Sequence, residues 1–397
     1  MLFICLFFVF LAAGFYLSSR KPLWTDEIFT QVTSIDPHSY LDVLSGQLPG
    51  EDNLCPLYYL IHKAACDLTG YRFPQAWDGV WSFSDHEGQM KMRIPSIIFM
   101  ATALAGFVTW GSALYGAGGA IIAAGLSLSS FMVWAYVAEA RPYALWFLLS
   151  LLQIMVWFKV IDTPSPRPRW VLLLLLLHLF LALTIVFSIG QIVLISLLIA
   201  ISKRDAKAGF VTGILPAMIV IYYLSKSMGM TWWTGWLPSS SEVEGSMPPI
   251  PQMFMAAYAQ VIKAFPVELV FLGLLLMIVI SRGGIFPGSS VKVSTVADRN
   301  LKVLWSYLAG LWFYAWIIVA VFMFFTNKAA SGAVVQDRYF IFLNPAALIA
   351  GFLSGGFILQ RLGGEHKLRW AMMAVFSGLW VNMLIRTVLD LTALGIY

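Results

Sequence analysis

The feature that constrains this chain most is a series of long apolar stretches. A helix that spans the hydrocarbon core of a bilayer needs ~20 apolar residues, within a range of roughly 17–25. Stretches of about this length recur along the whole chain, at residues 2–18, 94–114, 119–138, 142–161, 209–225, 267–281, 303–325, 340–359 and 370–389. The pattern predicts a helical membrane protein with many spans, because a helix satisfies its own backbone hydrogen bonds in lipid.

The composition agrees with this prediction and excludes two other classes. Of the 397 residues, 60% are hydrophobic and 11% are charged, whereas soluble domains average about 45–50% apolar and about 25% charged residues. A soluble fold would lack polar side chains to face water, and a disordered chain would be rich in charge. We therefore expect an all-α polytopic membrane protein in which residues 1–397 form a single transmembrane domain, without a separate soluble domain.

The apolar segment 170–201 is longer than one typical span and short for two spans. The charges on its flanks decide between one span and two. Arg167 precedes the segment, and Lys203 and Arg204 follow it. Basic residues collect on the cytoplasmic side of a membrane. If both flanks are cytoplasmic, the segment crosses outward and returns, turning near residues 188–191. The chain then has eleven spans.

The basic residues are distributed unequally between the two sides that these spans define. With the N-terminus inside, the short inner loops hold 13 basic and four acidic residues, whereas the rest of the chain holds 12 basic and 16 acidic residues. An excess of Lys and Arg marks cytoplasmic loops. The asymmetry predicts an N-in, C-out topology, and it explains the net charge of +5 without a nucleic-acid partner.

Two long loops, residues 19–93 and 226–266, fall on the outer side in this topology. In the first loop, apolar residues recur over 57–68 at the i, i+3, i+4, i+7 spacing of an amphipathic helix. Pro56 suits a first helical turn, and Gly70 suits a helix end. We therefore predict a juxtamembrane helix that lies in the membrane interface.

The second outer loop combines a predicted helix with a tryptophan-rich stretch. Residues 253–265 have the spacing of another amphipathic helix. Trp232, Trp233 and Trp236 precede it, among serines, glycines and prolines. These tryptophans fit an interfacial aromatic belt. They also fit a mobile loop over a site, with aromatic faces for a sugar or a lipid.

Two adjacent carboxylates, Asp26 and Glu27, follow the first span closely. In most proteins such a pair is a solvated helix cap. Here it opens a structured outer loop, and a carboxylate that loses water near the bilayer binds a proton more tightly unless a cation pairs with it. A group of this kind could act as a general base.

Two further outer segments combine guanidinium groups with phenols. Glu139, Arg141 and Tyr143 lie in the tight turn before the fourth span, and Arg338 and Tyr339 lie at the outer mouth of the tenth. A buried charge pair at a helix junction, or an interfacial anchor, would explain them structurally. The functional interpretation is an anion site, because the planar guanidinium fork can make two bonds to a phosphate.

Other outer residues give weaker signals. Lys91 and Arg93, before the second span, are either further cations of the same site or ordinary contacts to lipid headgroups. Cys55 and Cys66 can form a disulfide if the outer side is oxidising, and two cysteines leave this open. The five histidines lack the spacing of metal ligands, so we expect no structural metal.

Taken in order, these motifs resemble those of the GT-C glycosyltransferases, and in particular the protein mannosyltransferase and aminoarabinose transferase-like group. The resemblance rests on Asp-Glu at 26–27, Pro-Leu-Tyr-Tyr at 56–59, Glu-Ala-Arg-Pro-Tyr-Ala-Leu at 139–145 and Arg-Tyr-Phe at 338–340. The motif at 139–145 is the most specific. At 53–55 this chain reads Asn-Leu-Cys, where many relatives carry a basic or imidazole residue beside a double proline.

The resemblance implies an inverting transfer of a sugar from a polyprenyl-phosphate donor to an envelope glycan, lipid or protein acceptor. The site would lie on the outer face of a bacterial inner membrane. Asp26 would be the catalytic base, with Glu27 and Glu139 in support. No cofactor would be required, and the sequence does not support a divalent metal.

The resemblance also implies roles for groups around the base. The donor phosphate would be bound by Arg141, Arg338, Tyr143 and Tyr339. The donor and acceptor cavity would be lined by Tyr58, Tyr59, Lys91, Arg93, Trp232, Trp233 and Trp236.

Two other functions remain open at this stage. A transporter or flippase of lipid-linked glycans should spread its charged residues along a central path, whereas the groups named above gather at the outer mouth. A GT-C-like subunit that has lost catalysis is the other alternative, and the departure at residues 53–55 favours it.

Overall fold

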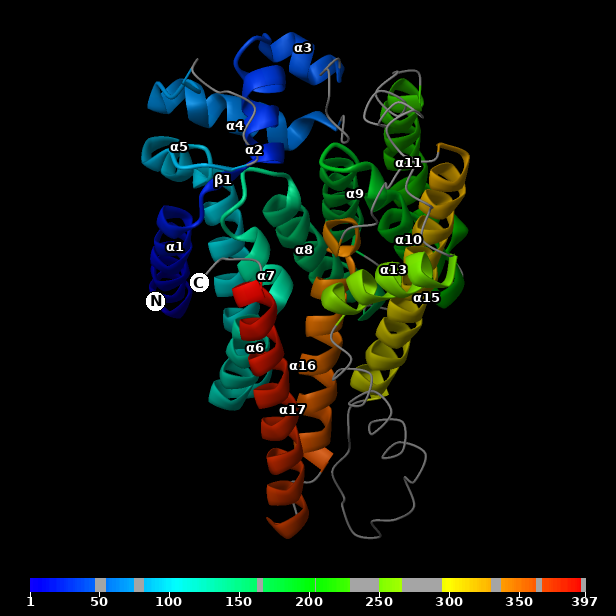
Figure 1. Cartoon of the computed structure of the whole chain (residues 1–397). Helices are drawn as coiled ribbons and strands as arrows, with labels where there is room; N and C mark the ends of the chain where they lie inside the picture. The colour runs from blue at the N-terminus through cyan, green and yellow to red at the C-terminus, as the bar shows by residue number, and fades with distance from the viewer. Residues whose placement is uncertain are drawn as a thin grey trace.

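The computed structural model of the chain describes residues 1–46, 55–74, 82–162, 167–203, 205–228, 250–265, 295–329, 337–361 and 366–393. Helices account for nearly all of the secondary structure in these ranges, and the long helices pack into a bundle (Figure 1). The predicted span at residues 267–281 and the three tryptophans Trp232, Trp233 and Trp236 lie outside the described residues.

Helices lie over most of the predicted spans in the described residues, and the predicted span at 119–138 is interrupted between residues 128 and 131. The elements before the centre of the chain are α1 (Leu2–Arg20), β1 (Leu23–Trp24), α2 (Thr25–Phe29), a π-helix (Thr30–Ile35), α3 (Tyr40–Ser45), α4 (Pro56–Thr69), β2 (Ser82–Phe83), α5 (His86–Lys91), α6 (Ile94–Leu128), α7 (Phe131–Tyr136) and α8 (Tyr143–Asp162). Those after it are α9 (Pro168–Ala182), a 3₁₀ turn (Val186–Ser188), α10 (Ile189–Lys203), α11 (Ala206–Met228), α13 (Ile250–Ala264), α15 (Thr295–Ala329), a second 3₁₀ turn (Asp337–Phe340), α16 (Leu343–Arg361) and α17 (His366–Ala393).

Five helices in the described residues are long and apolar enough to cross a membrane. They are Leu2–Arg20, His86–Leu128, Tyr143–Asp162, Ala206–Lys226 and Leu301–Val321. Three shorter apolar helices, within Pro168–Ala182, Val186–Ser202 and Leu343–Phe357, accompany them. The chain is therefore an all-α membrane protein, and its small antiparallel ribbon pairs only Leu23 with Phe83 and Trp24 with Ser82.

Helix α6 is broken where the sequence predicts the boundary between two spans, at residues 114–119. Tyr115 and Gly116 leave the helical conformation, and Gly116 has a φ of 63°, which glycine adopts without steric cost. Beyond the break the chain folds back closely, because a Cβ added to Gly119 would lie 2.2 Å from the carbonyl oxygen of Gly111. The apolar stretch 94–128 is thus two helical segments.

The segment 170–201 is also divided, near the predicted turn. Helix α9 ends at Ala182, the 3₁₀ turn Val186–Ser188 follows, and α10 begins at Ile189. The hydroxyl of Ser188 donates to the carbonyl oxygen of Leu181 at 3.0 Å and closes this turn. Two shorter helices therefore replace the single long one.

Helix α8 lies inside the bundle, in contact with α6, α9, α10 and α16 (Figure 1). Its residues are apolar on all sides, and Trp146, Phe147 and Trp157 are among the largest fully buried side chains. A helix that is hydrophobic all round is suited to such a position. The turn that precedes α8 is therefore fixed against the bundle core.

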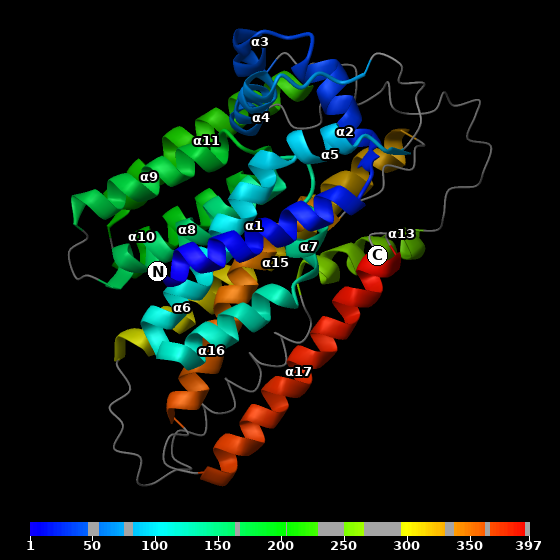
Figure 2. The same ribbon diagram turned by 90° about the vertical axis from the view of Figure 1, so that its left-hand side faces the viewer.

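The described residues between α1 and α6 form a layer of short helices at one end of the bundle, where α2, α3, α4 and α5 gather (Figures 1 and 2). Helix α4 begins with Pro56 in its first turn and ends at Gly70, whose φ is 66°. These bounds confirm the predicted amphipathic helix. Helix α13 (Ile250–Ala264) confirms the second predicted helix, and it lies across the long helices (Figure 1).

Candidate functional site

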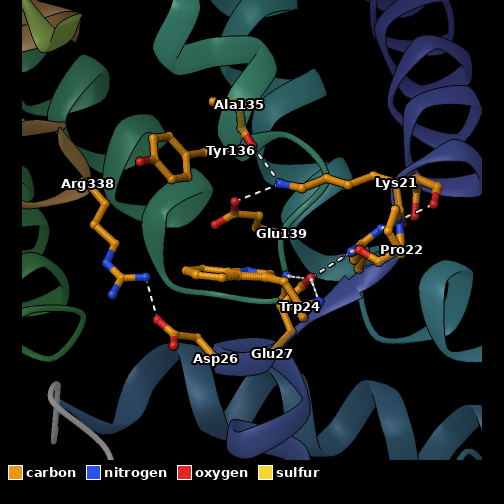
Figure 3. Close-up of polar contacts among 12 residues, drawn as sticks. Lys21, Pro22, Trp24, Asp26, Glu27, Ala135, Tyr136, Glu139 and Arg338 are labelled. Carbon is orange, nitrogen blue, oxygen red and sulfur yellow. Dashed lines mark hydrogen bonds and ion pairs between the residues drawn. The ribbon is translucent and has the colours of Figure 1, made fainter. Parts of the chain in front are cut away.

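Side chains from four distant parts of the chain meet below the layer of short helices. They come from the segment that runs from the end of α1 into α2, the start of α6, the turn between α7 and α8, and the 3₁₀ turn before α16. Figure 3 shows the first, third and fourth of these parts. Hydrogen bonds join residues as far as 312 positions apart in sequence. The first, third and fourth of the motifs singled out in the sequence thus form one cluster.

Asp26 and Arg338 form an ion pair across this cluster, and Figure 3 shows the carboxylate pointing toward the guanidinium group. The side chain of Arg338 is 6% exposed and that of Asp26 is 22% exposed. The Arg338 guanidinium also lies 5.1 Å from the ring centre of Trp24 and 5.7 Å from that of Tyr339. Two aromatic faces therefore flank a cation whose carboxylate partner is partly accessible to solvent.

Glu27, the neighbour of Asp26, is fully buried and binds Arg93. Nε and Nη2 of Arg93 donate to the two carboxylate oxygens at 2.8 and 2.6 Å. The backbone N–H of Ala140 donates to the same carboxylate at 2.7 Å, which ties the α7–α8 turn to this pair. Burial would raise the pKa of Glu27, but the Arg93 guanidinium outweighs burial and holds the pKa below its usual value.

Glu139 is bound to Lys21, a residue outside the motifs of the sequence. Lys21 Nζ donates to Glu139 Oε1 at 2.7 Å and to the carbonyl oxygen of Ala135 at 3.2 Å (Figure 3). Burial raises the pKa of Glu139, and the Lys21 ammonium opposes that rise. Lys21 could have been suspected, because it lies five residues before Asp26 in the same segment after the first span.

Arg141 joins the cluster through the π-helix. Its Nη1 donates to the hydroxyl of Thr30 at 2.6 Å, and its side chain is buried. Single π-helical turns often occur at functional sites. The ring of Tyr143 meets that of Tyr136 at 5.0 Å, and the Tyr136 hydroxyl donates to Asp337 beside Arg338. The two segments that carry the candidate phosphate-binding arginines are therefore in contact.

The residues proposed to line a cavity fall in different places. Tyr58 and Tyr59 are fully buried, and the Tyr58 hydroxyl lies 2.8 Å from the hydroxyl of Ser96. Arg93 donates all its N–H groups within the protein, so its guanidinium has none left for a ligand. Lys91 binds Glu87 at 2.5 Å on the partly exposed surface of α5.

The structure shows the state of the two cysteines Cys55 and Cys66 and the arrangement of potential metal ligands. Cys55 and Cys66 are both free thiols buried in the protein, so the disulfide left open by the sequence is not formed. Within the ranges that the structure describes, no group of three or more His, Cys, Asp or Glu side chains is arranged to hold a metal ion. The ionisable groups of the cluster are instead carboxylates paired with cations.

No protein-family model matches the chain, and no curated protein matches it. The chemistry of the cluster follows from its own groups. A partly exposed carboxylate can accept a proton, and arginines held by aromatic rings and hydroxyls can stabilise an anion. The arrangement suits a reaction in which one group loses a proton while a neighbouring oxyanion leaves.

Proposed function

We propose that the protein is a membrane glycosyltransferase that moves a sugar from a polyprenyl-phosphate donor to an acceptor. The observation that carries the proposal is the pairing of Asp26 with Arg338, next to the turn that bears Glu139 and Arg141. A proton acceptor and two arginines then lie at the end of a membrane bundle. A lipid-linked anion could reach such a site with its tail still in the bilayer.

In the proposed reaction, Asp26 takes the proton from the acceptor's hydroxyl or amine group. The acceptor oxygen or nitrogen bonds to the anomeric carbon, and the bond from this carbon to the phosphate oxygen breaks. The electron pair leaves with the polyprenyl phosphate, whose charge Arg338 and Arg141 stabilise. Attack from the face opposite the leaving group inverts the configuration of the sugar.

Asp26 is the better candidate for the base than Glu27, because the two carboxylates differ in their surroundings. Glu27 is fully buried, and its two oxygens accept from Arg93 and from the backbone. Asp26 is partly exposed and can meet an acceptor. We assign Glu27 and Glu139 to positioning, because each holds the α7–α8 turn beside the base.

The decisive experiment measures transfer from a defined polyprenyl-phosphate sugar by the purified protein in lipid nanodiscs. We expect Asp26→Asn to lower turnover by at least about 100-fold, since it removes the proton acceptor. Glu87→Gln, an exposed charge-removing control, should retain turnover. A folded Asp26→Asn variant with unchanged turnover would overturn the assignment. Movement of a lipid-linked glycan across vesicles without any transfer would favour a transporter, and neither activity would favour a non-catalytic subunit.

We propose a finer arrangement of eleven spans, with the N-terminus inside and the site on the outer face of a bacterial inner membrane. The unequal distribution of basic residues supports this topology. Reporter fusions test it: a reporter after residue 203 should be cytoplasmic, and one after residue 228 should be outside. The reverse pattern would place the site on the inner face. The acceptor on that outer face would be an envelope glycan, lipid or protein.

A further inference from the structure

Two Arg–carboxylate pairs lie close together in this protein, and they differ in how completely the arginine donors are used. Arg93 donates five N–H groups to five acceptor sites, namely the two oxygens of Glu27 and the carbonyl oxygens of Ser18, Lys21 and Pro22. A guanidinium group has five N–H donors in total. This pair is therefore closed, and a ligand could bind Arg93 only by breaking it.

The pair between Arg338 and Asp26 is open by comparison. Nη1 of Arg338 donates to Asp26 Oδ2, and within the part of the chain that the structure describes the buried Nε has no hydrogen-bond acceptor. A bidentate arrangement, which arginine and carboxylate groups favour, is not formed here. The residue as a whole is 5% exposed, so water does not readily supply the missing acceptor.

A second donor in the same group is also unused. The indole Nε1 of Trp24, whose ring faces the Arg338 guanidinium, is buried without an acceptor among the described residues. Buried N–H donors left unpaired are costly and uncommon in folded proteins. A guanidinium and an indole offer only donors. The ligand that would satisfy them is an acceptor with negative charge, which describes an oxyanion.

We propose that Asp26 and the donor's phosphate compete for Arg338. Arg338 binds Asp26 in the unliganded protein, and binding of the phosphate to Arg338 releases Asp26 to act as the base. This inference rests on the proposed function and adds an order of events to it. While Arg338 binds Asp26, the carboxylate oxygen that accepts from the guanidinium is not available to the acceptor's hydroxyl or amine group. Phosphate binding removes that partner, so the donor binds first and the acceptor is deprotonated afterwards.

The inference makes a prediction that a simple catalytic role for Asp26 does not make. If Asp26 and the phosphate compete for Arg338, removing the charge of Asp26 leaves Arg338 available. Asp26→Asn should then bind the phosphate more tightly than the wild type, although it loses turnover. A base that plays no part in donor binding would leave the affinity unchanged.

The experiment measures binding of undecaprenyl phosphate to the full chain in nanodiscs, with inorganic phosphate as a second probe. We expect Asp26→Asn to raise affinity for undecaprenyl phosphate on the order of tenfold, a usual size for coupling between two ligands. Arg338→Gln should lower it, and Arg338→Lys should restore part of the loss, because charge remains without the fork. Glu87→Gln should bind as the wild type does. A response to undecaprenyl phosphate alone assigns the site to the lipid, and an equal response to inorganic phosphate assigns it to the phosphate group.

Thermal unfolding of each variant separates loss of binding from loss of fold. If folded Asp26→Asn binds undecaprenyl phosphate no more tightly than the wild type does, the competition for Arg338 is overturned. Absence of binding by the wild-type protein overturns it as well. The two proposals fail separately. Lost turnover with unchanged affinity overturns the competition and leaves Asp26 as the base. Tighter phosphate binding by Asp26→Asn with retained turnover overturns the assignment of Asp26 as the base, and the competition for Arg338 stands.

Discussion

Arg93 and Glu27 are paired through two parallel hydrogen bonds, 2.8 and 2.6 Å long, and neither side chain is exposed. The pair joins the start of α6 to α2, two regions 66 positions apart in sequence. Since Glu27 also accepts from the backbone of Ala140, one carboxylate holds three parts of the chain together. Asp26 is the next residue, so its position depends on this pair.

Arg93→Lys should destabilise the protein strongly. Lysine keeps the charge but cannot make two parallel bonds or supply five donors. Several of the five acceptors would lose their donor inside the protein, and because each unsatisfied buried group costs about 1–3 kcal/mol, the free energy of unfolding should fall by about 3–5 kcal/mol. Titration with a denaturing detergent measures this loss. Lys91→Ala removes the exposed pair with Glu87 and should cost no more than about 1 kcal/mol; an equal loss in both variants would contradict our view of Arg93.

The pair between Lys21 and Glu139 should show strong coupling in a double-mutant cycle. Lys21→Met leaves the Glu139 carboxylate buried without a cation, which is costly. Glu139→Gln removes that charge, so the double variant Lys21→Met with Glu139→Gln should lose less stability than the two single losses added together. We expect a coupling of about 1–3 kcal/mol, measured by unfolding of the four proteins under one condition. Additive losses would show that the two residues act independently.

Stability should fall below neutral pH in part because of His62. The side chain is buried in α4 with Nε2 2.8 Å from Gln31 Oε1, and burial lowers its pKa from 6.5 to about 4. Between these two values the unfolded chain binds a proton that the folded chain does not, so stability is complete above pH 6.5 and is lost as the pH falls toward 4. The loss from this one group should be up to about 3 kcal/mol.

His62→Gln tests this pH dependence. Its amide can still donate to Gln31, but it does not titrate. The difference in unfolding free energy between pH 7 and pH 4 should therefore be smaller in the variant than in the wild type. Identical pH profiles for the two proteins would mean that His62 gains its proton equally well in the folded state.

The break within α6 should depend on the left-handed backbone of Gly116. Alanine there should cost about 1–2 kcal/mol, because its Cβ meets the adjacent carbonyl in this conformation. Gly118 offers a matched control, since it is exposed and nothing lies within 4 Å of an added Cβ. Gly118→Ala should be neutral or should stabilise by up to about 1 kcal/mol. Equal effects of the two substitutions, measured as shifts in unfolding midpoint, would contradict a strained turn.

Much of the fold could be predicted from local patterns. The bounds of α4 follow from Pro56, from apolar residues at helical spacing and from Gly70, all of which act within a few residues of one another. The division of residues 170–201 followed from its length and its flanking charges. The span count, the topology and the enzymatic activity stay predictions.

The partners of the site residues could not be predicted in this way. Asp26 and Arg338 were both singled out, but no pattern indicated that they would touch each other. No motif marks Lys21 as a partner of Glu139, and Arg93, a predicted cavity residue, uses its donors within the protein. Such contacts join residues tens to hundreds of positions apart, so they depend on how the helices pack.

The scarcity of charge, the apolar stretches and the glycine and proline positions are enough to define a helical membrane protein with a structured loop at one end. Hydrophobic burial and backbone conformation act locally, and residue order records them directly. The difference between the closed pair at Glu27 and the open pair at Asp26 arises from packing. Two adjacent carboxylates look alike in the sequence, and the cations that the bundle brings beside them make them different.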